Sequence, residues 1–269
     1  MREIQWYYPT LVEEAVSLIK REGVIAHAGG TNILRGSLKR VKGLVDLSHL
    51  PLKYHRHRGN TVEIGACITL ADAAAYLEQT NGENVLVKAL KSAASTPLRN
   101  RITLGGSIAL FPAWSDPMGP LIALDAEVEL AGKKSGYFPV TRYVDEPAFR
   151  KDTLITGVRV RMDTWMSFYY RETRTAADHP AFTVTLLLKS EEDRITDLRG
   201  VIIGCVGRYQ RLLQLEEWLV GMQKGGVSLG DIGRHVNVSF TGKKFLSPAY
   251  LKHLVDVQVE RGIAELTGR

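Results

Sequence analysis

Two glycine pairs, Gly29-Gly30 and Gly105-Gly106, constrain the fold of this chain more than any other feature of its sequence. The first pair ends the short apolar run Val24-Ile25-Ala26, and the second comes directly after Thr103-Leu104. Glycine adopts positive φ without strain and has no Cβ atom, so that consecutive backbone N–H groups can converge on an anion. One glycine pair after a strand usually marks a tight turn. Two pairs flanked by short polar residues instead predict two loops that together cradle a diphosphate.

Polar side chains beside both pairs supply further hydrogen-bond donors. Thr31 and Asn32 follow the first pair, and Ser107 follows the second. Neither pair fits the spacing G-x-G-x-x-G of the dinucleotide fingerprint, which argues against a Rossmann domain. We therefore expect an anion site built from Ala28, Gly29, Gly30, Thr31, Asn32, Thr103, Gly105, Gly106 and Ser107.

Hydrophobic spacing indicates a mixture of helices and strands along the whole chain. Apolar runs and alternation predict strands at 24–26, 43–47, 61–65, 127–130, 153–160, 182–188 and 198–206. Helical spacing predicts helices at 9–22, 70–76, 84–94, 211–220 and 248–265. Thr10 is the expected cap of the first helix, and the pattern changes near Asp163, which indicates a second domain. The sequence thus predicts an α+β protein.

The balance of charges discriminates weakly between classes of partner. The chain has 35 Lys and Arg against 29 Asp and Glu, a formal net charge of +6. The basic residues are scattered, without the concentrated helix stripe that is typical of a nucleic-acid reader. No apolar run approaches the roughly eighteen residues of a membrane-spanning helix, and the first residues lack the pattern of a signal peptide. We therefore expect a soluble cytoplasmic protein that binds neither nucleic acid nor membrane.

Cysteine and histidine usage argues against metal or disulfide chemistry in this chain. Cys67 and Cys205 are too few for a disulfide framework and lack the paired spacing of a zinc or iron–sulfur site. Both lie in apolar runs, which predicts buried core thiols. His55 and His57 have no carboxylate at ligand spacing, so no metal site is expected there. Any iron–sulfur chemistry must belong to a partner.

Several further segments make the sequence recognisable when they are taken with the two glycine pairs. They are Tyr8-Pro9, Glu14-Ala15, Pro97-Leu98-Arg99-Asn100, Ser115-Asp116 and the stretch 121–128. In this order and spacing they resemble the FAD-binding medium subunit of molybdenum hydroxylases such as xanthine dehydrogenase and carbon monoxide dehydrogenase. The resemblance covers nearly the whole chain and is looser around Phe168-Tyr169, Arg174 and Asp178.

The resemblance implies a specific α+β architecture. A two-part FAD-binding domain of the vanillyl-alcohol-oxidase or PCMH type is expected over residues 1–162, with subdomains at about 1–52 and 53–162. A smaller α+β domain is expected over 163–269, with an antiparallel sheet and helices like those of the C-terminal domain of carbon monoxide dehydrogenase flavoproteins.

The resemblance also implies noncovalent FAD, with its diphosphate between the two glycine loops. Asp116 stands where the family has an aspartate at the adenosine end, and a carboxylate there can accept ribose hydroxyls. The alternative is a cap or turn residue before Pro117. Arg171 follows Tyr169-Tyr170 and stands one residue away from a lysine that the family often places near the flavin ring. A cation there would raise the flavin potential. The alternative is a solvated surface arginine.

Other departures and neighbours leave alternatives open. Asn32 replaces the usual aspartate of the first loop and Ser107 the usual asparagine of the second, and both keep a small polar group. His27 precedes the first loop, and covalent flavin attachment through it is not expected. Trp114 follows the second loop, where a plain packing role is favoured over covering the cofactor.

The function implied by the resemblance is electron transfer. A partner molybdopterin subunit hydroxylates a substrate, a partner iron–sulfur subunit relays the electrons, and FAD in this chain passes them to a soluble acceptor such as NAD. No catalytic acid or base is then needed from the chain. Two alternatives stay open: a self-sufficient FAD-dependent oxidoreductase of the same fold, and a cofactor-free scaffold or regulatory protein, which the departures at Asn32, Ser107 and Tyr170 would suit.

Overall fold

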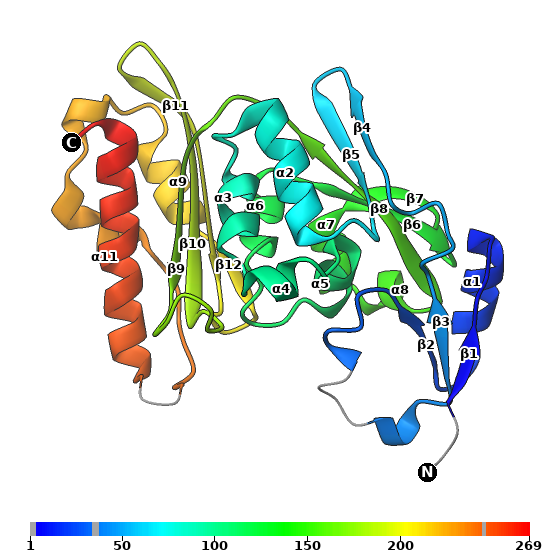
Figure 1. Ribbon diagram of the computed structural model, residues 1–269. Helices are drawn as coiled ribbons and strands as arrows, with labels where there is room; N and C mark the ends of the chain where they lie inside the picture. Colours follow the sequence, from blue (N-terminus) through cyan, green and yellow to red (C-terminus); the bar gives the residue numbers. More distant parts are fainter. Residues whose placement is uncertain (1–3, 34–37, 244–245) are drawn as a thin grey trace. The chain divides into compact units, whose positions relative to one another are not determined.

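The computed structural model describes residues 4–33, 38–243 and 246–269, which form two compact units (Figure 1). The first unit takes the described residues of Met1–Tyr76, Ser95–Phe111 and Leu124–Met162. The second takes those of Leu77–Ala94, Pro112–Ala123 and Asp163–Arg269. The chain therefore passes repeatedly from one unit to the other. The domain boundary at 162/163 stays a prediction.

The first unit begins with a small parallel sheet and one helix. The strand order is β1 (Gln5–Tyr7), β3 (Gly43–Asp46), β2 (Val24–His27), and α1 (Val12–Ile19) packs against it (Figure 1). The strands expected at 24–26 and 43–47 and the helix expected at 9–22 are confirmed, with shifted ends for the helix. Because all strands are parallel, their carboxyl ends meet at one edge of the sheet. The first glycine segment, Ala28–Asn32, follows β2 at that edge.

The first helix begins later than the sequence suggested. Its N-cap residue is Leu11, which makes no side-chain capping bond, so the predicted cap at Thr10 is wrong. Glu13 and Glu14 lie in the first turn, where their charges interact favourably with the positive end of the helix dipole.

A five-stranded antiparallel sheet forms the second part of this unit. Its order is β4 (His55–Arg58), β5 (Thr61–Gly65), β8 (Thr153–Arg161), β6 (Glu127–Gly132), β7 (Gly136–Pro139). The accompanying helices are α4 (Thr96–Arg99), α5 (Leu104–Leu110), α7 (Val140–Asp145) and α8 (Pro147–Arg150). Val62, Ile64 and Val158 face one side of the sheet and are buried, and α5 contacts β8.

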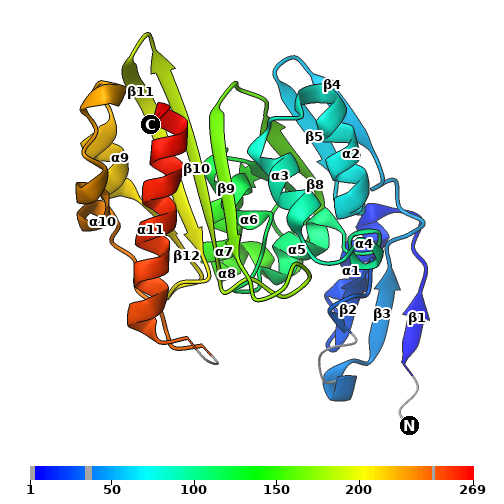
Figure 2. The ribbon, with the colours of Figure 1, turned by 60° about the vertical axis from the view of Figure 1, so that its left-hand side comes forward.

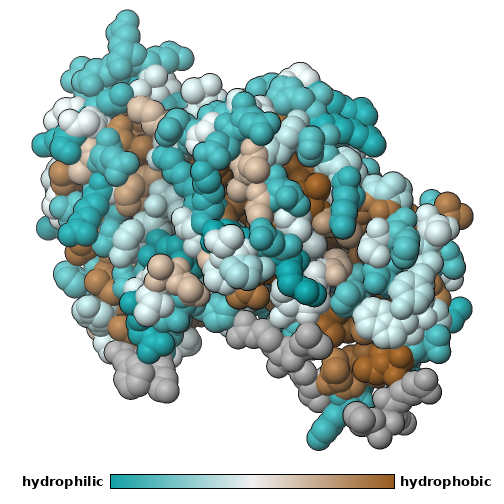
Figure 3. Space-filling model, viewed as in Figure 1, coloured by the Kyte–Doolittle hydropathy of each residue, from teal (hydrophilic) through white to brown (hydrophobic). Residues whose placement is uncertain are grey.

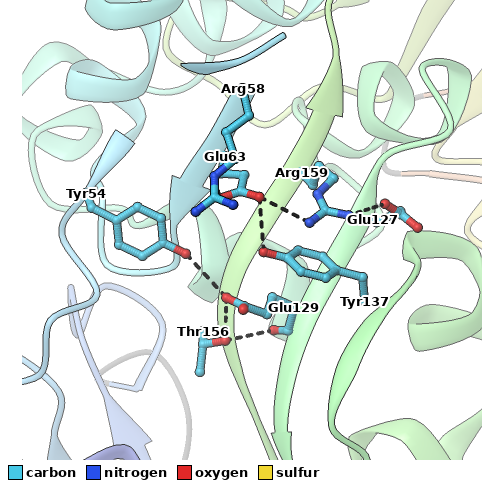
Figure 4. Close-up of polar contacts among 8 residues, drawn as sticks. All are labelled: Tyr54, Arg58, Glu63, Glu127, Glu129, Tyr137, Thr156 and Arg159. Atoms are coloured by element: carbon cyan, nitrogen blue, oxygen red, sulfur yellow. Dashed lines mark hydrogen bonds and ion pairs between the residues drawn. The ribbon is translucent and has the colours of Figure 1, made fainter. Parts of the chain in front are cut away.

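The opposite side of the five-stranded sheet carries charged side chains (Figure 4). Glu63 of β5 is only 5% exposed, yet its carboxylate is surrounded by partners. Arg159 Nη2 lies 3.1 Å and Arg58 Nε 3.5 Å from its oxygens, and the Tyr137 hydroxyl donates to it over 3.4 Å. Four strands, β4, β5, β7 and β8, are therefore joined through one buried carboxylate.

A second carboxylate continues this network towards the start of β4 (Figure 4). Glu129 accepts hydrogen bonds from the hydroxyls of Tyr54, over 3.3 Å, and Thr156, over 3.0 Å. Burial raises the pKa of Tyr54, and the neighbouring Glu129 raises it further. A Cβ atom on Gly157 would lie 2.6 Å from the Tyr54 hydroxyl, so the hydroxyl can take this position only over a glycine.

The second unit is built on a four-stranded antiparallel sheet. Its order is β12 (Tyr209–Arg211), β11 (Arg194–Ile203), β10 (Phe182–Glu191), β9 (Met166–Glu172). Figures 1 and 2 show α11 (Pro248–Thr267) along one face, where α9 (Leu213–Leu219) and α10 (Ile232–His235) also pack, and α3 (Val85–Ser92) and α6 (Met118–Ala123) on the other. The expected antiparallel sheet with helices is confirmed.

Alternation along β10 separates two kinds of core. Phe182, Val184 and Leu186 point towards α9, α10 and α11 and belong to the main apolar cluster of this unit. Thr183 and Thr185 point to the opposite face and are fully buried. There a Cβ atom on Gly119 of α6 would lie 2.7 Å from the Thr185 hydroxyl, so α6 packs closely on the sheet. The first passage of the chain from one unit to the other, after Tyr76, falls inside α2 (Leu70–Asn81).

The surface in Figure 3 is mostly hydrophilic, with apolar residues visible in several small areas across the view. In the part of the chain that the structure describes, no helix is long and apolar enough to cross a membrane. Cys67 and Cys205 are buried free thiols, as predicted, and burial raises the pKa of each to about 11.

Candidate functional site

The first glycine segment requires glycine at both positions, for different reasons. Gly30 has φ +70°, a left-handed conformation that residues with a side chain rarely adopt. Gly29 does not have a positive φ, but a Cβ atom there would lie 1.8 Å from the carbonyl oxygen of Arg101. No side chain can occupy that space unless one of the two backbones moves.

This close approach joins the two glycine segments. Arg101 lies between α4 and α5, just before the second pair, and its guanidinium Nη2 also donates to the Gly29 carbonyl over 3.3 Å. The structure therefore brings the first glycine segment, Ala28–Asn32, against Arg101, two residues before the second glycine segment, 103–107, inside the first unit. Arg101 was not among the residues expected at the site, because its contact with Gly29 spans 72 positions and leaves no local pattern.

The second glycine pair is the start of a helix rather than a loop. Thr103 is the N-cap of α5, and Gly105 and Gly106 lie in the first turn, outside the region of positive φ. The expectation of positive φ at this pair is therefore wrong. Glycine is needed here for close packing, since a Cβ atom on Gly105 would lie 2.6 Å from the Cβ of Ala66.

The two segments also differ in the hydrogen bonds of their N–H groups. The N–H of Gly105 donates to the Ala66 carbonyl over 2.9 Å, and that of Gly106 to Thr103 Oγ1 over 3.2 Å. Ser107 donates from its N–H to the Thr103 carbonyl over 3.0 Å. By contrast, no described residue accepts a hydrogen bond from the N–H of Gly29 or Gly30. The first segment can therefore offer backbone donors to an anion, whereas the second offers mainly hydroxyl groups and a tightly packed wall.

A histidine and an aspartate lie at the base of the first segment. His27 and Asp46 are register partners at the carboxyl ends of β2 and β3. His27 Nδ1 lies 4.0 Å from Asp46 Oδ2, and its Nε2 faces Gly30, where an added Cβ atom would lie 2.8 Å away. Burial raises the pKa of Asp46, but hydrogen bonds from Ser48 and the nearby imidazoles of His27 and His49 outweigh it, and the net shift is downward.

Asp116 and Arg171 form an ion pair inside the second unit. Arg171 Nε lies 2.8 Å from Asp116 Oδ1, and the Tyr169 hydroxyl donates to the same oxygen over 2.8 Å. Arg171 also donates to the carbonyls of Ala176 and Asp178. The side chain of Arg171 is only 12% exposed, so the alternative of a solvated surface arginine is wrong. Burial raises the pKa of Asp116, although Arg171 and Tyr169 act against it.

Comparison with known proteins identifies the family. Residues 2–160 match the family described as the FAD binding domain in molybdopterin dehydrogenase. The chain belongs to this family, and its cofactor is FAD. It is 27% identical over 282 residues to the nicotine 6-hydroxylase medium subunit of Paenarthrobacter nicotinovorans. The alignment covers 99% of this chain and 98% of that protein.

Two solved structures share the fold. Reconstituted CO dehydrogenase from Oligotropha carboxidovorans matches with a TM-score of 0.89 at 18% identity, covering 99% of this chain and 98% of that one. Quinoline 2-oxidoreductase from Pseudomonas putida 86 matches with a TM-score of 0.88 at 17% identity, covering 99% and 97%. The chain is thus an FAD-binding subunit of the molybdenum hydroxylase family.

The first glycine segment fits the diphosphate of FAD. The Arg101 carbonyl and the His27 imidazole take up the positions that Cβ atoms on Gly29 and Gly30 would need, and within the described residues the N–H groups of both glycines have no acceptor. Thr31 and Asn32 follow with short polar side chains, both at least partly exposed. Backbone donors and short hydroxyl or amide groups are the ligands that a diphosphate prefers.

Proposed function

We propose that this chain is the FAD subunit of a molybdenum hydroxylase of the xanthine dehydrogenase type, in which electrons from a partner's iron–sulfur clusters pass through FAD to an acceptor such as NAD. The first glycine segment carries the proposal. The left-handed backbone at Gly30, together with the N–H groups of Gly29 and Gly30 that donate to no described residue, suits the diphosphate of the family's cofactor.

The residues of the first unit divide the work of holding the diphosphate. Ala28–Asn32 binds it through backbone N–H groups and short side chains. Thr103 accepts from the Gly106 N–H, which leaves its hydroxyl proton to be donated, whereas the Ser107 hydroxyl already donates to the Thr103 carbonyl over 3.0 Å. Gly105 keeps α5 close to Ala66. The second segment thus contributes shape and the Thr103 hydroxyl, while the first contributes the N–H donors.

The resemblance puts Asp116 at the ribose hydroxyls of the adenosine end and Arg171 near the flavin ring, at opposite ends of FAD. Because the two side chains touch at 2.8 Å, at most one of these roles can hold, and the proposal keeps Arg171 near the flavin ring. When bound, FAD supplies the electron transfer at that ring. Because Asp116 lies 2.8 Å from the guanidinium, much of the positive charge of Arg171 is neutralised before it acts on any neighbour. We therefore expect Arg171 to tune the flavin less than an unpaired cation would.

The proposed partners are an iron–sulfur subunit and a molybdopterin subunit. The match over nearly the full length of a protein named as the medium subunit of a hydroxylase supports this part of the proposal. The test is a pull-down with the tagged full chain from its own cells, followed by measurement of iron and molybdenum. Co-purification of both metals is expected. Turnover by the chain alone, without either metal, would favour the self-sufficient oxidoreductase.

The cofactor assignment of the chain itself is tested by absorption. The purified chain should show flavin bands and release FAD, not FMN, on denaturation. A colourless protein that takes up no added FAD would contradict the proposal and favour a cofactor-free scaffold. This measurement needs no partner, so it separates the cofactor from the complex.

A matched pair of glycine variants tests the first segment. Gly30 and Gly59 both have positive φ, +70° and +58°, so alanine costs about 1 kcal/mol of backbone strain at either position. Gly59 lies in the β4–β5 turn, where a Cβ atom meets nothing within 4 Å, whereas at Gly30 it would meet His27 Nε2. Gly30→Ala should lose FAD while Gly59→Ala keeps it. Equal flavin content in the two variants would remove the segment from the site.

A further inference from the structure

His27 occupies a position that the diphosphate assignment leaves without a role. It is the last residue of β2, immediately before the first glycine segment, and its imidazole folds back over that segment, so that Nε2 faces Gly30. Trp6 of β1 packs edge-on against the ring, with centroids 5.0 Å apart, and holds its plane. The side chain is 20% exposed.

The other nitrogen of His27 points into the protein. Nδ1 is buried and has no hydrogen-bond partner among the described residues, and Asp46 Oδ2 lies 4.0 Å from it. Asp46 is fixed on β3, where the Ser48 N–H donates to its Oδ1 over 2.8 Å. A neutral imidazole must present a bare acceptor at one of its nitrogens. Whichever tautomer forms, that acceptor would face either the Asp46 carboxylate or the anion expected at Gly30.

We propose that His27 is a cofactor-binding residue: its protonated imidazole donates from Nε2 to the diphosphate of FAD, Asp46 positions it from Nδ1, and FAD binding takes up a proton. This rests on the proposed place of the diphosphate in the first glycine segment. An imidazolium donates from both nitrogens, and two anionic neighbours on opposite sides of the ring favour that form. Imidazole is the side chain whose charge changes near neutral pH, so the uptake falls in an accessible range.

The charged and titratable groups around His27 come from three segments of the described chain. Asp46 and His49 lie at the end of β3 and just beyond it, and His49 contacts the ring of Tyr8, which follows β1. Arg101 reaches the Gly29 carbonyl from the segment between α4 and α5. The positive charge of Arg101, and that of His49 when it is protonated, disfavour a positive charge on His27. Of these groups, only Asp46 favours it. An added diphosphate shifts this balance towards protonated His27.

Calorimetry of FAD binding to the full chain freed of flavin tests the proposal. Titrations at one pH between 7 and 8, in buffers with different heats of ionisation, give the number of protons taken up. The wild type should take up a fraction of a proton with FAD and also with ADP, which carries the diphosphate without the flavin. His27→Gln should abolish the proton uptake. It should also weaken the binding of FAD about tenfold or more, because one charge-assisted hydrogen bond is lost. His57→Gln, at an exposed histidine on β4, should leave both unchanged.

The outcomes separate this proposal from the cofactor assignment. If the wild type binds FAD without proton uptake, or His27→Gln keeps the uptake, His27 has no such role and the diphosphate site stands. If neither FAD nor ADP binds to the wild type, both proposals fall. Asp46→Asn provides a second variant in case His27→Gln does not fold, and it should shift the uptake to lower pH while FAD still binds.

Discussion

Arg171 is largely buried and forms an internal ion pair with Asp116. Its Nε and Nη2 atoms contact the Asp116 carboxylate, and its Nη1 donates to the Ala176 carbonyl. The Asp116 side chain is only 8% exposed. Removing one member of such a pair leaves the other charged, buried and unpaired, which costs far more than losing a surface ion pair.

Arg171→Met is therefore expected to lower the free energy of unfolding by about 3–5 kcal/mol. Arg174→Met is the matched control, because Arg174 is 72% exposed and pairs with Asp178 at 3.4 Å, so its loss should cost at most about 1 kcal/mol. Asp116→Asn added to Arg171→Met should recover part of the stability. Denaturant unfolding measures all three. If the variants at positions 171 and 174 lose the same free energy of unfolding, the buried ion pair stabilises the protein no more than the exposed one.

The same residue tests the proposed flavin environment. If Arg171 lies near the ring, a milder variant that still retains FAD, Arg171→Lys, should shift the midpoint potential, because a flexible ammonium cannot keep the two-point contact with Asp116. The potential is measured by spectroscopic titration of the bound flavin. An unchanged potential would leave Arg171 with a purely structural role and remove it from the cofactor site.

At the scale of elements, the polar side of the five-stranded sheet ties its strands together. Glu63 on β5 contacts Arg159 on β8 and Tyr137 on β7, which are not adjacent to one another in the sheet (Figure 4). Each of these contacts has a buried carboxylate as its acceptor, and hydrogen bonds to charged groups are roughly twice as strong as neutral ones. The sheet is thus stabilised by polar side-chain contacts on one side and by apolar packing on the other.

Glu63→Gln should lower the free energy of unfolding by about 1–3 kcal/mol, because one charged acceptor is lost in a site with little water. Glu22→Gln is the control: Glu22 also pairs with a basic residue, Lys42 at 3.2 Å, but its side chain is 92% exposed. That variant should change the free energy by less than about 0.5 kcal/mol. Thermal or urea unfolding of both variants measures the difference. If Glu63→Gln leaves the free energy of unfolding unchanged, the network does not contribute to stability.

Strands with one apolar side were predictable, and strands with two polar or mixed sides were not. The strands at 61–65 and 153–160 and the C-terminal helix at 248–265 are confirmed within a few residues. β9 was not predicted. Ser167, Tyr169 and Arg171 alternate on the side of this strand that carries the Asp116 pair, and no hydrophobic period marks it. The predicted strand at 198–206 lies several residues late, since β11 begins at Arg194.

The candidate site divides in the same way between local and distant signals. The first glycine segment follows a strand, and that sequence pattern was sufficient to predict it. The second pair was interpreted as a loop because Gly105-Gly106 normally disfavours a helix, but the Thr103 cap and the packing on Ala66 outweigh that propensity. Arg101 and Asp46 join the site only through contacts far apart in sequence, which a single sequence does not reveal.

At the scale of the molecule, the two compact units are interleaved along the chain. Residues 77–94 and 112–123 lie before the predicted boundary at 162/163, yet they belong to the second unit. There α3 contacts β9, and α6 contacts β10 and β11. All six residues of α6 are buried. These helices therefore depend on a sheet that the chain supplies only after Asp163.

A fragment of residues 1–162 tests this dependence, because it contains the whole family match at 2–160 and both glycine segments. Cutting the chain there exposes α6 and the apolar side of α3, including Leu86 and Leu90, which are fully buried in the complete chain. Exposed apolar surface of this kind drives association. The fragment should aggregate or unfold without a cooperative transition, and residues 163–269 expressed with it should restore folding and FAD binding. If the fragment alone unfolds cooperatively and retains FAD, the boundary at 162/163 separates true domains, and α3 and α6 are held well enough by the first unit.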